Sequence, residues 1–207
     1  GTNGAGKTTL INILSGQQKP TSGVARLDGR PITGARPDIV ARMGVGRTYQ
    51  SLRLFGKMTC LENAMIGAQL NKGYNLTQAL LSLPVFWKRE KALRDTAMEM
   101  LAAVGLEDSA AKEASSLPYG DQRLLEIART LAMKPRLLLL DEPAAGMNPR
   151  ESADLVETIR RVQKDFDLTV LLIEHDMKVV MELCEYIYVM AFGETIFHGL
   201  PQEVSEH

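Results

Sequence analysis

The chain has 207 residues, enough for one domain with a sizeable buried core, and its 45% hydrophobic and 24% charged residues are typical of a globular protein. Its formal net charge of −1 argues against a protein that binds nucleic acid through bulk positive charge. No apolar run approaches the roughly 18–20 residues of a membrane-spanning helix. Cys60 and Cys184 lie in no metal-ligand spacing, so we expect both to be buried thiols.

The chain begins with a phosphate-binding motif, because residues 1–8 fit the pattern G-x-x-x-x-G-K-[ST]. In this motif glycines let backbone N–H groups point at phosphates, the lysine (Lys7) reaches the β- and γ-phosphates, and the hydroxyl of Thr8 binds Mg²⁺. Residues 8–14 predict a helix whose N-terminus favours an anion. The expected nucleotide-binding residues here are Asn3, Gly4, Ala5, Gly6, Lys7, Thr8 and Thr9.

A phosphate-binding loop ordinarily follows a buried parallel strand, and no residue precedes Gly1 in this sequence. We therefore expect the chain to be the C-terminal part of a longer domain whose N-terminal strands are missing. We also expect the strand that leads into the loop to lie in the centre of the sheet, beside residues 137–140.

The next segments predict short elements followed by helices. Residues 24–32 predict two strands around a turn at Asp28-Gly29, residues 38–43 a helix, and residues 44–49 a strand. From about residue 54 to residue 116 there is almost no strand pattern, and apolar residues recur at helical spacing over 88–104. This stretch predicts a helical subdomain inserted into an α/β core.

Strands then alternate with helices. Residues 137–140 and 168–173 predict buried strands, and a helix begins at Asn148, with Pro149 and Glu151 in its first turn, and ends near residue 166. A helix over 177–184 and a strand pair complete the chain; the pair covers residues 186–191 and 195–198. This alternation predicts a parallel sheet with helices on both faces, and a ligand site at the carboxyl ends of its strands.

Paired carboxylates follow the first of these buried strands. Asp141 and Glu142 would lie at the carboxyl edge of the sheet, beside the phosphate-binding loop. Asp141 would hold Mg²⁺ through water, and Glu142 would accept a proton from an attacking water molecule. A single aspartate at the end of a strand more often caps a turn or helix, but the phosphate-binding motif favours the metal role.

Four motifs together resemble the nucleotide-binding subunit of ABC transporters in order and spacing: the phosphate-binding loop and residues 117–122, 137–143 and 174–176. The resemblance covers essentially the whole chain. Residues 46–50, 119–123, 141–149 and 172–177 further resemble the ATP-binding subunit of bacterial branched-chain amino acid importers. The resemblance implies one domain over 1–207 with the P-loop NTPase fold of ABC type. Residues 1–53 and 134–207 would form its α/β core, and residues 54–133 its helical subdomain.

The resemblance also implies roles for individual residues. Gln50 would contact Mg²⁺ and the attacking water, and His175 would contact the γ-phosphate. The N–H groups of Tyr119 and Gly120 would serve the γ-phosphate of ATP held mainly by a second subunit. The expected catalytic residues are thus Glu142, His175, Gln50 and Lys7, and the expected metal ligands are Thr8, Gln50 and Asp141.

Three features depart from the family pattern. The signature L-S-G-G-Q is replaced by residues 117–121, in which Pro118 supplies neither a hydroxyl nor an N–H group, although proline suits the first turn of the helix predicted over 120–133. Asn148 stands where the family more often has aspartate. The aromatic residue that stacks on adenine in the family would lie upstream of Gly1.

The predicted function is that of an ATP- and Mg²⁺-dependent ATPase subunit that powers an importer, for branched-chain amino acids, at the cytoplasmic face of the bacterial inner membrane. Its expected partners are a second ABC ATPase subunit, membrane permease subunits and, indirectly, a periplasmic solute-binding protein, without nucleic acid. The alternatives are a soluble ABC ATPase acting on nucleic acid or ribosomes, a subunit with an inactive site, and an ATPase for another solute such as urea or for lipopolysaccharide export.

Overall fold

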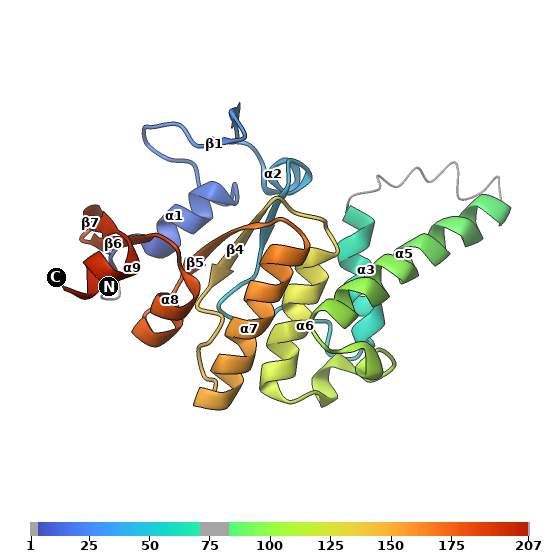
Figure 1. Ribbon diagram of the computed structural model, residues 1–207. Helices are drawn as coiled ribbons and strands as arrows, with labels where there is room; N and C mark the ends of the chain where they lie inside the picture. The colour runs from blue at the N-terminus through green and yellow to red at the C-terminus, as the bar shows by residue number, and fades with distance from the viewer. Residues whose placement is uncertain (1–3, 71–82, 207) are drawn as a thin grey trace.

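A computed structural model describes residues 4–70 and 83–206, in which helices pack on both faces of a small parallel sheet (Figure 1). The sheet has the order β3–β4–β5, formed by Val45–Arg47, Leu137–Asp141 and Thr169–Ile173, and both pairings are parallel. In this register Leu139 lies opposite Arg47 on one side and Leu171 on the other. The predicted α/β fold with a parallel sheet is confirmed.

The four consecutive leucines of β4 are explained by burial on both faces, because successive side chains of a strand point to opposite sides. Leu139 packs with Ile11 of helix α1 (Lys7–Leu14) in one apolar cluster. Leu138 and Leu140 belong to a second, larger cluster on the opposite face, to which helices α6 (Tyr119–Leu131) and α7 (Pro149–Asp165) contribute together with two helices described below. Packing on both faces therefore fixes the position of β4 and of the carboxyl end of the sheet.

The expected position of the strand that leads into the phosphate-binding loop is wrong. β4 pairs with β3 along one edge and with β5 along the other, so neither edge of residues 137–140 is open. Within residues 4–70 and 83–206, the open edges of this sheet are the outer edges of β3 and β5. The error arose because strand order in a parallel sheet is set by the helical crossovers and not by neighbouring motifs in the sequence.

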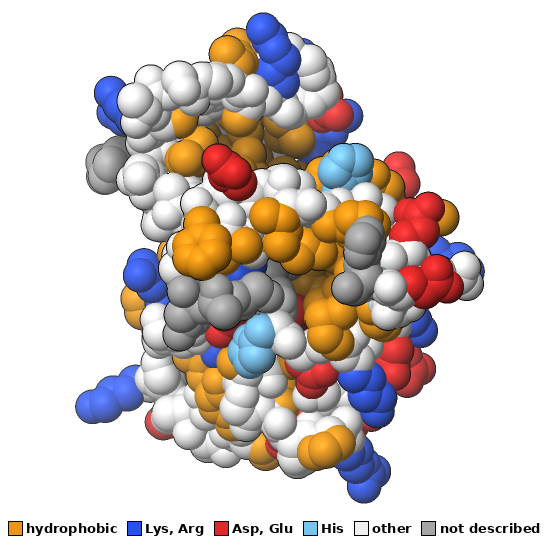
Figure 2. Space-filling model, turned by 90° about the vertical axis from the view of Figure 1, so that its left-hand side faces the viewer, with side chains coloured by type: hydrophobic (Ala, Val, Ile, Leu, Met, Phe, Trp, Pro, Cys, Tyr) orange, Lys and Arg blue, Asp and Glu red, His pale blue; other side chains and the backbone are white. Residues whose placement is uncertain are grey.

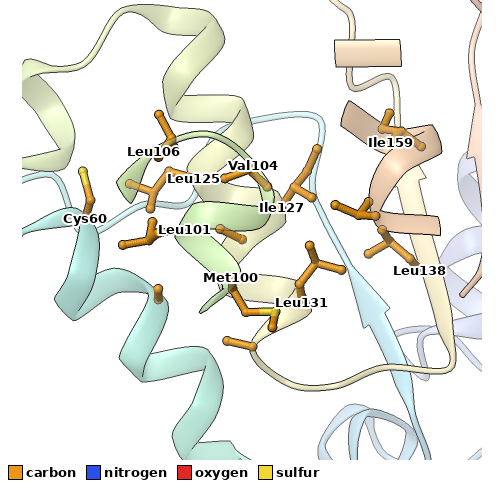
Figure 3. Close-up of a cluster of buried hydrophobic side chains, with 14 of the residues drawn as sticks. Cys60, Met100, Leu101, Val104, Leu106, Leu125, Ile127, Leu131, Leu138 and Ile159 are labelled. Atoms are coloured by element: carbon orange, nitrogen blue, oxygen red, sulfur yellow. The ribbon is translucent and has the colours of Figure 1, made fainter. Parts of the chain in front are cut away.

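Helices α3 (Cys60–Leu70), α5 (Leu83–Ala103) and α6 separate β3 from β4, with 3₁₀ turns at Glu107–Ser109 and Ala114–Ser116. Their apolar side chains meet in the cluster of Figure 3, and this cluster continues into the sheet layer through Leu138 of β4 and Ile159 of α7. The helices and the sheet thus share one continuous core, and the division into two subdomains stays a prediction. No helix within residues 4–70 and 83–206 is long and apolar enough to cross a membrane.

Helix α7 begins as its sequence predicts. Asn148 Oδ1 accepts hydrogen bonds from the N–H groups of Arg150 and Glu151, each at 3.0 Å, and the Glu151 carboxylate accepts one from the Asn148 N–H at 2.9 Å. Pro149 occupies the first helical position, where it needs no hydrogen-bond partner. This capping box fixes the direction in which the chain leaves the loop after β4.

The N-terminal part adds a hairpin and a short helix. Strands β1 (Arg26–Leu27) and β2 (Arg30–Pro31) pair antiparallel around Asp28 and Gly29, whose φ angles of 47° and 77° suit a two-residue hairpin turn. Helix α2 (Pro37–Arg42) then leads into β3. The predicted strand over 44–49 is shorter in the structure, because Thr48 continues into a loop that passes to the site.

The C-terminal part consists of helix α8 (Met177–Leu183), the antiparallel hairpin β6 (Ile187–Ala191) and β7 (Glu194–Gly199), and helix α9 (Pro201–Ser205). Hydrophobic side chains gather over the face of the molecule seen in Figure 2. The exposed apolar residues of this C-terminal part include Tyr186, Tyr188, Phe192, Ile196 and Leu200. On the hairpin, Tyr186 and His198 form a hydrogen bond of 2.6 Å between the phenol oxygen and Nδ1.

The two cysteines are free thiols. Cys60, the first residue of α3, is fully buried as expected, whereas Cys184 at the end of α8 is only partly buried. Burial raises the pKa of both thiols above the ordinary value, and a thiol that stays protonated is a poor nucleophile. Both cysteines therefore serve packing.

Candidate functional site

The predicted catalytic side chains lie at one edge of the sheet, where the three parallel strands end. Gln50 follows β3 by three residues, Glu142 follows β4 directly, and His175 follows β5 by two residues. Because the carboxyl ends of neighbouring parallel strands share an edge, the loops after them converge. The structure thus brings together three residues that are far apart in the sequence.

Glu142 lies at the centre of this group. Its Oε2 accepts a hydrogen bond from Gln50 Nε2 at 3.0 Å, and its Oε1 lies 3.6 Å from His175 Nδ1. The Glu142 side chain is 18% exposed and the His175 side chain 60% exposed, so the carboxylate is shielded but reachable. One oxygen is oriented by an amide and the other faces a solvent-accessible imidazole, which is a suitable arrangement for taking a proton from water.

The backbone at Glu142 has a left-handed conformation with φ of 50°, which is uncommon for a residue other than glycine. Two hydrogen bonds fix this conformation. The Glu142 N–H donates to the Ile173 carbonyl at 2.9 Å, and the Glu142 carbonyl accepts from the Ala145 N–H at 3.1 Å. Such backbone strain is found preferentially at functional sites, where the surrounding structure holds it.

Glu174 holds together the loops that follow β4 and β5. Its side chain is almost fully buried; Oε1 accepts from the Ala144 N–H at 3.0 Å and Oε2 from the His175 N–H at 3.2 Å. The sequence placed Glu174 in a motif without giving it a role. The sequence feature that could have predicted this role is a charged residue between a buried strand and His175, since a buried carboxylate there needs hydrogen-bond donors.

Asp141, the other expected carboxylate, is paired with a residue that the sequence analysis missed. Asp141 Oδ2 lies 3.2 Å from a guanidinium nitrogen of Arg47, and the two side chains are only 6% and 8% exposed. Arg47 is the last residue of β3, beside the last residues of β4 in a parallel pairing. An arginine that ends a buried strand next to an aspartate strand end is the signal that could have predicted this ion pair.

The phosphate-binding loop is described from Gly4 onward, and Asn3 lies outside the described residues. Gly4 and Gly6 both have φ of 91°, a conformation that glycine adopts without strain. Gly6 caps helix α1 and, having no side chain, makes no cap bond to the N–H groups of its first turn. Ala5 is buried, and its carbonyl accepts from the Gly193 N–H at 3.2 Å, which anchors the loop on the β6–β7 turn.

The signature segment forms the start of helix α6. Pro118 is the N-cap and Tyr119 the first helical residue, so proline lies one position earlier than the expected first turn. The Tyr119 hydroxyl donates to the Ala145 carbonyl at 3.1 Å, which ties the signature to the loop after β4. The carboxylate of Glu151 lies close to Gly120, with Oε1 3.5 Å from where a Cβ of that residue would stand. No side chain caps this helix start.

Arg123 of α6 joins the signature to the segment that carries Gln50. Its guanidinium donates to the Tyr49 carbonyl at 2.8 Å, to the Gln50 carbonyl, and to the Tyr119 hydroxyl at 2.8 Å. Arg123 also lies 3.5 Å from the Glu126 carboxylate. The position of Gln50 is therefore fixed by the signature helix through its backbone.

Glu126 is the buried acid of this network. It accepts from the Tyr49 N–H at 3.4 Å and lies 3.8 Å from Arg129, which itself donates to the Arg53 carbonyl. Burial raises the pKa of the Glu126 carboxyl above its ordinary value, since desolvation outweighs the two neighbouring arginines. Burial likewise lowers the pKa of Arg129. A charged residue within the apolar stripe of α6 was the signal for this network.

Tyr49 is a structural residue of the same segment. The guanidinium carbons of Arg47 and Arg53 lie 4.9 Å and 4.0 Å from the centre of its ring, and its hydroxyl accepts from Gln17 Nε2 at 2.7 Å. Two guanidinium groups thus lie near the ring, which stabilises the loop through cation–π contacts.

The three side chains expected to bind Mg²⁺ all carry oxygen donors. They are the Asp141 carboxylate, the Thr8 hydroxyl and the amide oxygen of Gln50, whose Nε2 is already used on Glu142. Mg²⁺ prefers oxygen ligands and is commonly held by one or two carboxylates together with substrate phosphates. Among the described residues no group of three His, Cys, Asp or Glu side chains could hold a metal by itself.

Comparisons with known proteins define the class. Residues 1–145 match the family described as ABC transporter, and the chain belongs to this family, as one of its ATP-hydrolysing ATPases. Among solved structures it is similar to a nucleotide-free ATP-binding cassette from an ABC transporter, with a TM-score of 0.84 and 30% identity over 99% of this chain and 80% of that one. An ADP conformation of such a cassette matches with the same TM-score of 0.84 and the same 30% identity and coverage.

Sequence relatives are more similar. The chain is 42% identical over 207 residues to the high-affinity branched-chain amino acid transport ATP-binding protein BraF of Pseudomonas aeruginosa. That alignment covers 100% of this chain and 81% of BraF. It is 44% identical over 204 residues to the high-affinity branched-chain amino acid transport ATP-binding protein LivG of Salmonella typhimurium. That alignment covers 99% of this chain and 80% of LivG. The predicted ABC ATPase class is confirmed.

Proposed function

We propose that this chain is the ATP-binding and ATP-hydrolysing subunit of a bacterial importer for branched-chain amino acids. The observation that carries the proposal is the identity of 42–44% to BraF and LivG along essentially the whole chain. The cluster of Gln50, Glu142 and His175 supports an active site rather than an inactive one, because the base and the groups that orient it are all within contact.

In this proposal Glu142 takes the proton from the water that attacks the γ-phosphate. Gln50 orients the Glu142 carboxylate and offers its amide oxygen to the site, while His175 faces the γ-phosphate. Lys7 and the N–H groups of the loop at Gly4–Gly6 hold the β- and γ-phosphates, where charge develops during in-line displacement. Mg²⁺, held by Asp141 and Thr8, supplies positive charge to the same phosphates.

The signature segment supports a proposal for the assembly. Tyr119 and Gly120 start helix α6 without a side-chain cap, so their N–H groups are suited to an anion. We infer that they bind the γ-phosphate of ATP held by a second subunit, in a head-to-tail dimer with two shared sites. The helical subdomain, residues 54–133, would contact membrane permeases at the cytoplasmic face of the inner membrane, and a periplasmic binding protein would deliver the solute.

The test is solute uptake in the organism that encodes the chain. Deletion of its gene is expected to abolish high-affinity uptake of radiolabelled leucine, isoleucine and valine, with recovery by the wild-type gene and no recovery by Glu142→Gln. The matched control is uptake of a neutral sugar, which stays unchanged. Loss of urea uptake alone would assign another solute, and unchanged uptake of all solutes would favour an ATPase that acts outside transport.

A further inference from the structure

Arg47 carries a charge that the proposed mechanism does not use. Its guanidinium is buried against Asp141, with 3.2 Å between a terminal nitrogen and Oδ2, and both side chains are less than one-tenth exposed. Burying two charges is costly unless they compensate each other and meet further hydrogen-bond partners. Arg47 therefore needs an explanation beyond surface electrostatics.

The other nitrogen of the guanidinium is bound to helix α1. It donates to Asn12 Oδ1 at 2.7 Å and to Ser15 Oγ at 2.8 Å, and Ser15 in turn donates to the Ile11 carbonyl at 2.8 Å. One guanidinium thus joins the end of β4 to the helix that begins at the phosphate-binding loop. Within the described residues its Nε is buried without a hydrogen-bond partner, so the side chain is held at its tip alone.

We propose that Arg47 is the resident counter-charge of the metal-binding carboxylate, a positioning residue that keeps Asp141 compensated before Mg²⁺ arrives and shares the carboxylate with the ion afterwards. This inference rests on the metal role of Asp141 in the proposed function. Arg47 donates to Asp141 Oδ2, so in this proposal Asp141 Oδ1 is the oxygen that binds the metal. Arg47 is bound to Asp141, Asn12 and Ser15, and in this proposal it acts through Asp141.

A definite linkage follows from this arrangement. Without the guanidinium, Asp141 becomes a buried carboxylate with no counter-charge there, which destabilises the metal-free protein. Mg²⁺ bound with nucleotide then supplies the missing positive charge, so it stabilises the variant more than the wild type. A merely structural arginine elsewhere would lower stability without changing the effect of the metal.

The experiment compares wild type with Arg47→Gln, which removes the charge, and Arg47→Lys, which keeps it. Thermal unfolding is measured with a non-hydrolysable ATP analogue, adenylyl imidodiphosphate, first with EDTA and then over a series of Mg²⁺ concentrations. Arg129→Gln is the matched control, since Arg129 is largely buried and pairs with Glu126, and it bonds neither Asp141 nor Gln50 among the contacts of the described residues.

For Arg47→Gln we expect a lower melting temperature in EDTA and a larger rise on adding Mg²⁺ than in the wild type. The Mg²⁺ concentration at half effect should fall at least about tenfold, since a unit charge a few ångströms from a cation alters its binding by that much or more at the effective dielectric of a protein surface. Arg47→Lys should resemble the wild type. Arg129→Gln should lose stability and keep the wild-type response to Mg²⁺.

An unchanged or increased Mg²⁺ requirement in Arg47→Gln would overturn the counter-charge role. If the wild type itself showed no Mg²⁺-dependent rise, the proposed metal role of Asp141 would fail and the inference with it, which separates the two failures. If Arg47→Gln does not fold, the double variant Arg47→Gln/Asp141→Asn decides: recovery of folding supports compensation of Asp141, and failure to recover contradicts it.

Discussion

Replacing Arg123 with methionine should remove the connection between the signature helix and the Gln50 segment while keeping the length of the aliphatic side chain. The guanidinium binds the carbonyls of Tyr49 and Gln50, the hydroxyl of Tyr119, and the carboxylate of Glu126. Two of these partners lie in the loop after β3 and two lie in α6. Because all of them are bound by one guanidinium, a single substitution removes every one of these contacts.

The expected loss follows from the burial of the pair. The side chains of Arg123 and Glu126 are 5% and 1% exposed, and breaking such a pair by removing one partner typically costs about 3–5 kcal/mol. Arg129 remains 3.8 Å from Glu126 and offsets part of this cost. We therefore expect the free energy of unfolding to fall by about 3–4 kcal/mol, which for a domain of this size lowers Tm by roughly 6–16 °C.

The measurement is urea unfolding followed by circular dichroism at pH 7, without nucleotide. Arg161→Met is the control, because Arg161 also donates to a backbone carbonyl, that of Ala103, but from an exposed position, so its loss should be under about 1 kcal/mol. Adding Glu126→Gln to Arg123→Met should restore part of the stability, since no unpaired buried carboxylate remains. A loss at Arg123 no larger than at Arg161 would refute the reasoning.

Other expectations concern chemistry, assembly and pH. Glu142→Gln should abolish steady-state ATP hydrolysis and leave equilibrium ATP binding intact, whereas Lys7→Ala should weaken binding itself; normal turnover in Glu142→Gln would remove the residue from the base role. In the Glu142→Gln background, Pro118→Ser should tighten the ATP-bound dimer in sedimentation with Mg-ATP by about tenfold or less, because a serine at this N-cap restores a hydroxyl near the phosphate while the loss of proline at a helix start offsets part of the gain. A weakened or unchanged dimer would place position 118 away from the phosphate. Because burial raises the pKa of Glu126 above 4.5, its ionisation opposes folding, and the stability of the wild type relative to Glu126→Gln should fall as pH rises from 4.5 toward that raised pKa. Urea unfolding across that range measures the slope, and a difference independent of pH contradicts the assignment.

The sequence by itself determined the local motifs and the secondary-structure elements that carry them. Glycines at fixed spacing before Lys7 predict a phosphate-binding loop, and four leucines before Asp141 predict a strand buried on both faces. The capping box at Asn148 was also predicted and is confirmed in the structure. These features depend on local rules, such as backbone freedom, side-chain alternation and hydrogen bonding within three residues, so they can be predicted without knowledge of the tertiary fold.

Only the tertiary structure decided which strands pair and which charges meet. Both edges of β4 are occupied by β3 and β5, against the expectation, because pairing depends on how helical crossovers pack and not on local propensity. The contact between Arg47 and Asp141 joins residues 94 positions apart, and that between Arg123 and the Tyr49 carbonyl joins residues 74 apart. A charge at the end of a buried strand or within an apolar stripe indicates that a partner is needed, but local rules do not name that partner. Buried charges find their partners only after the hydrophobic layers have placed them together.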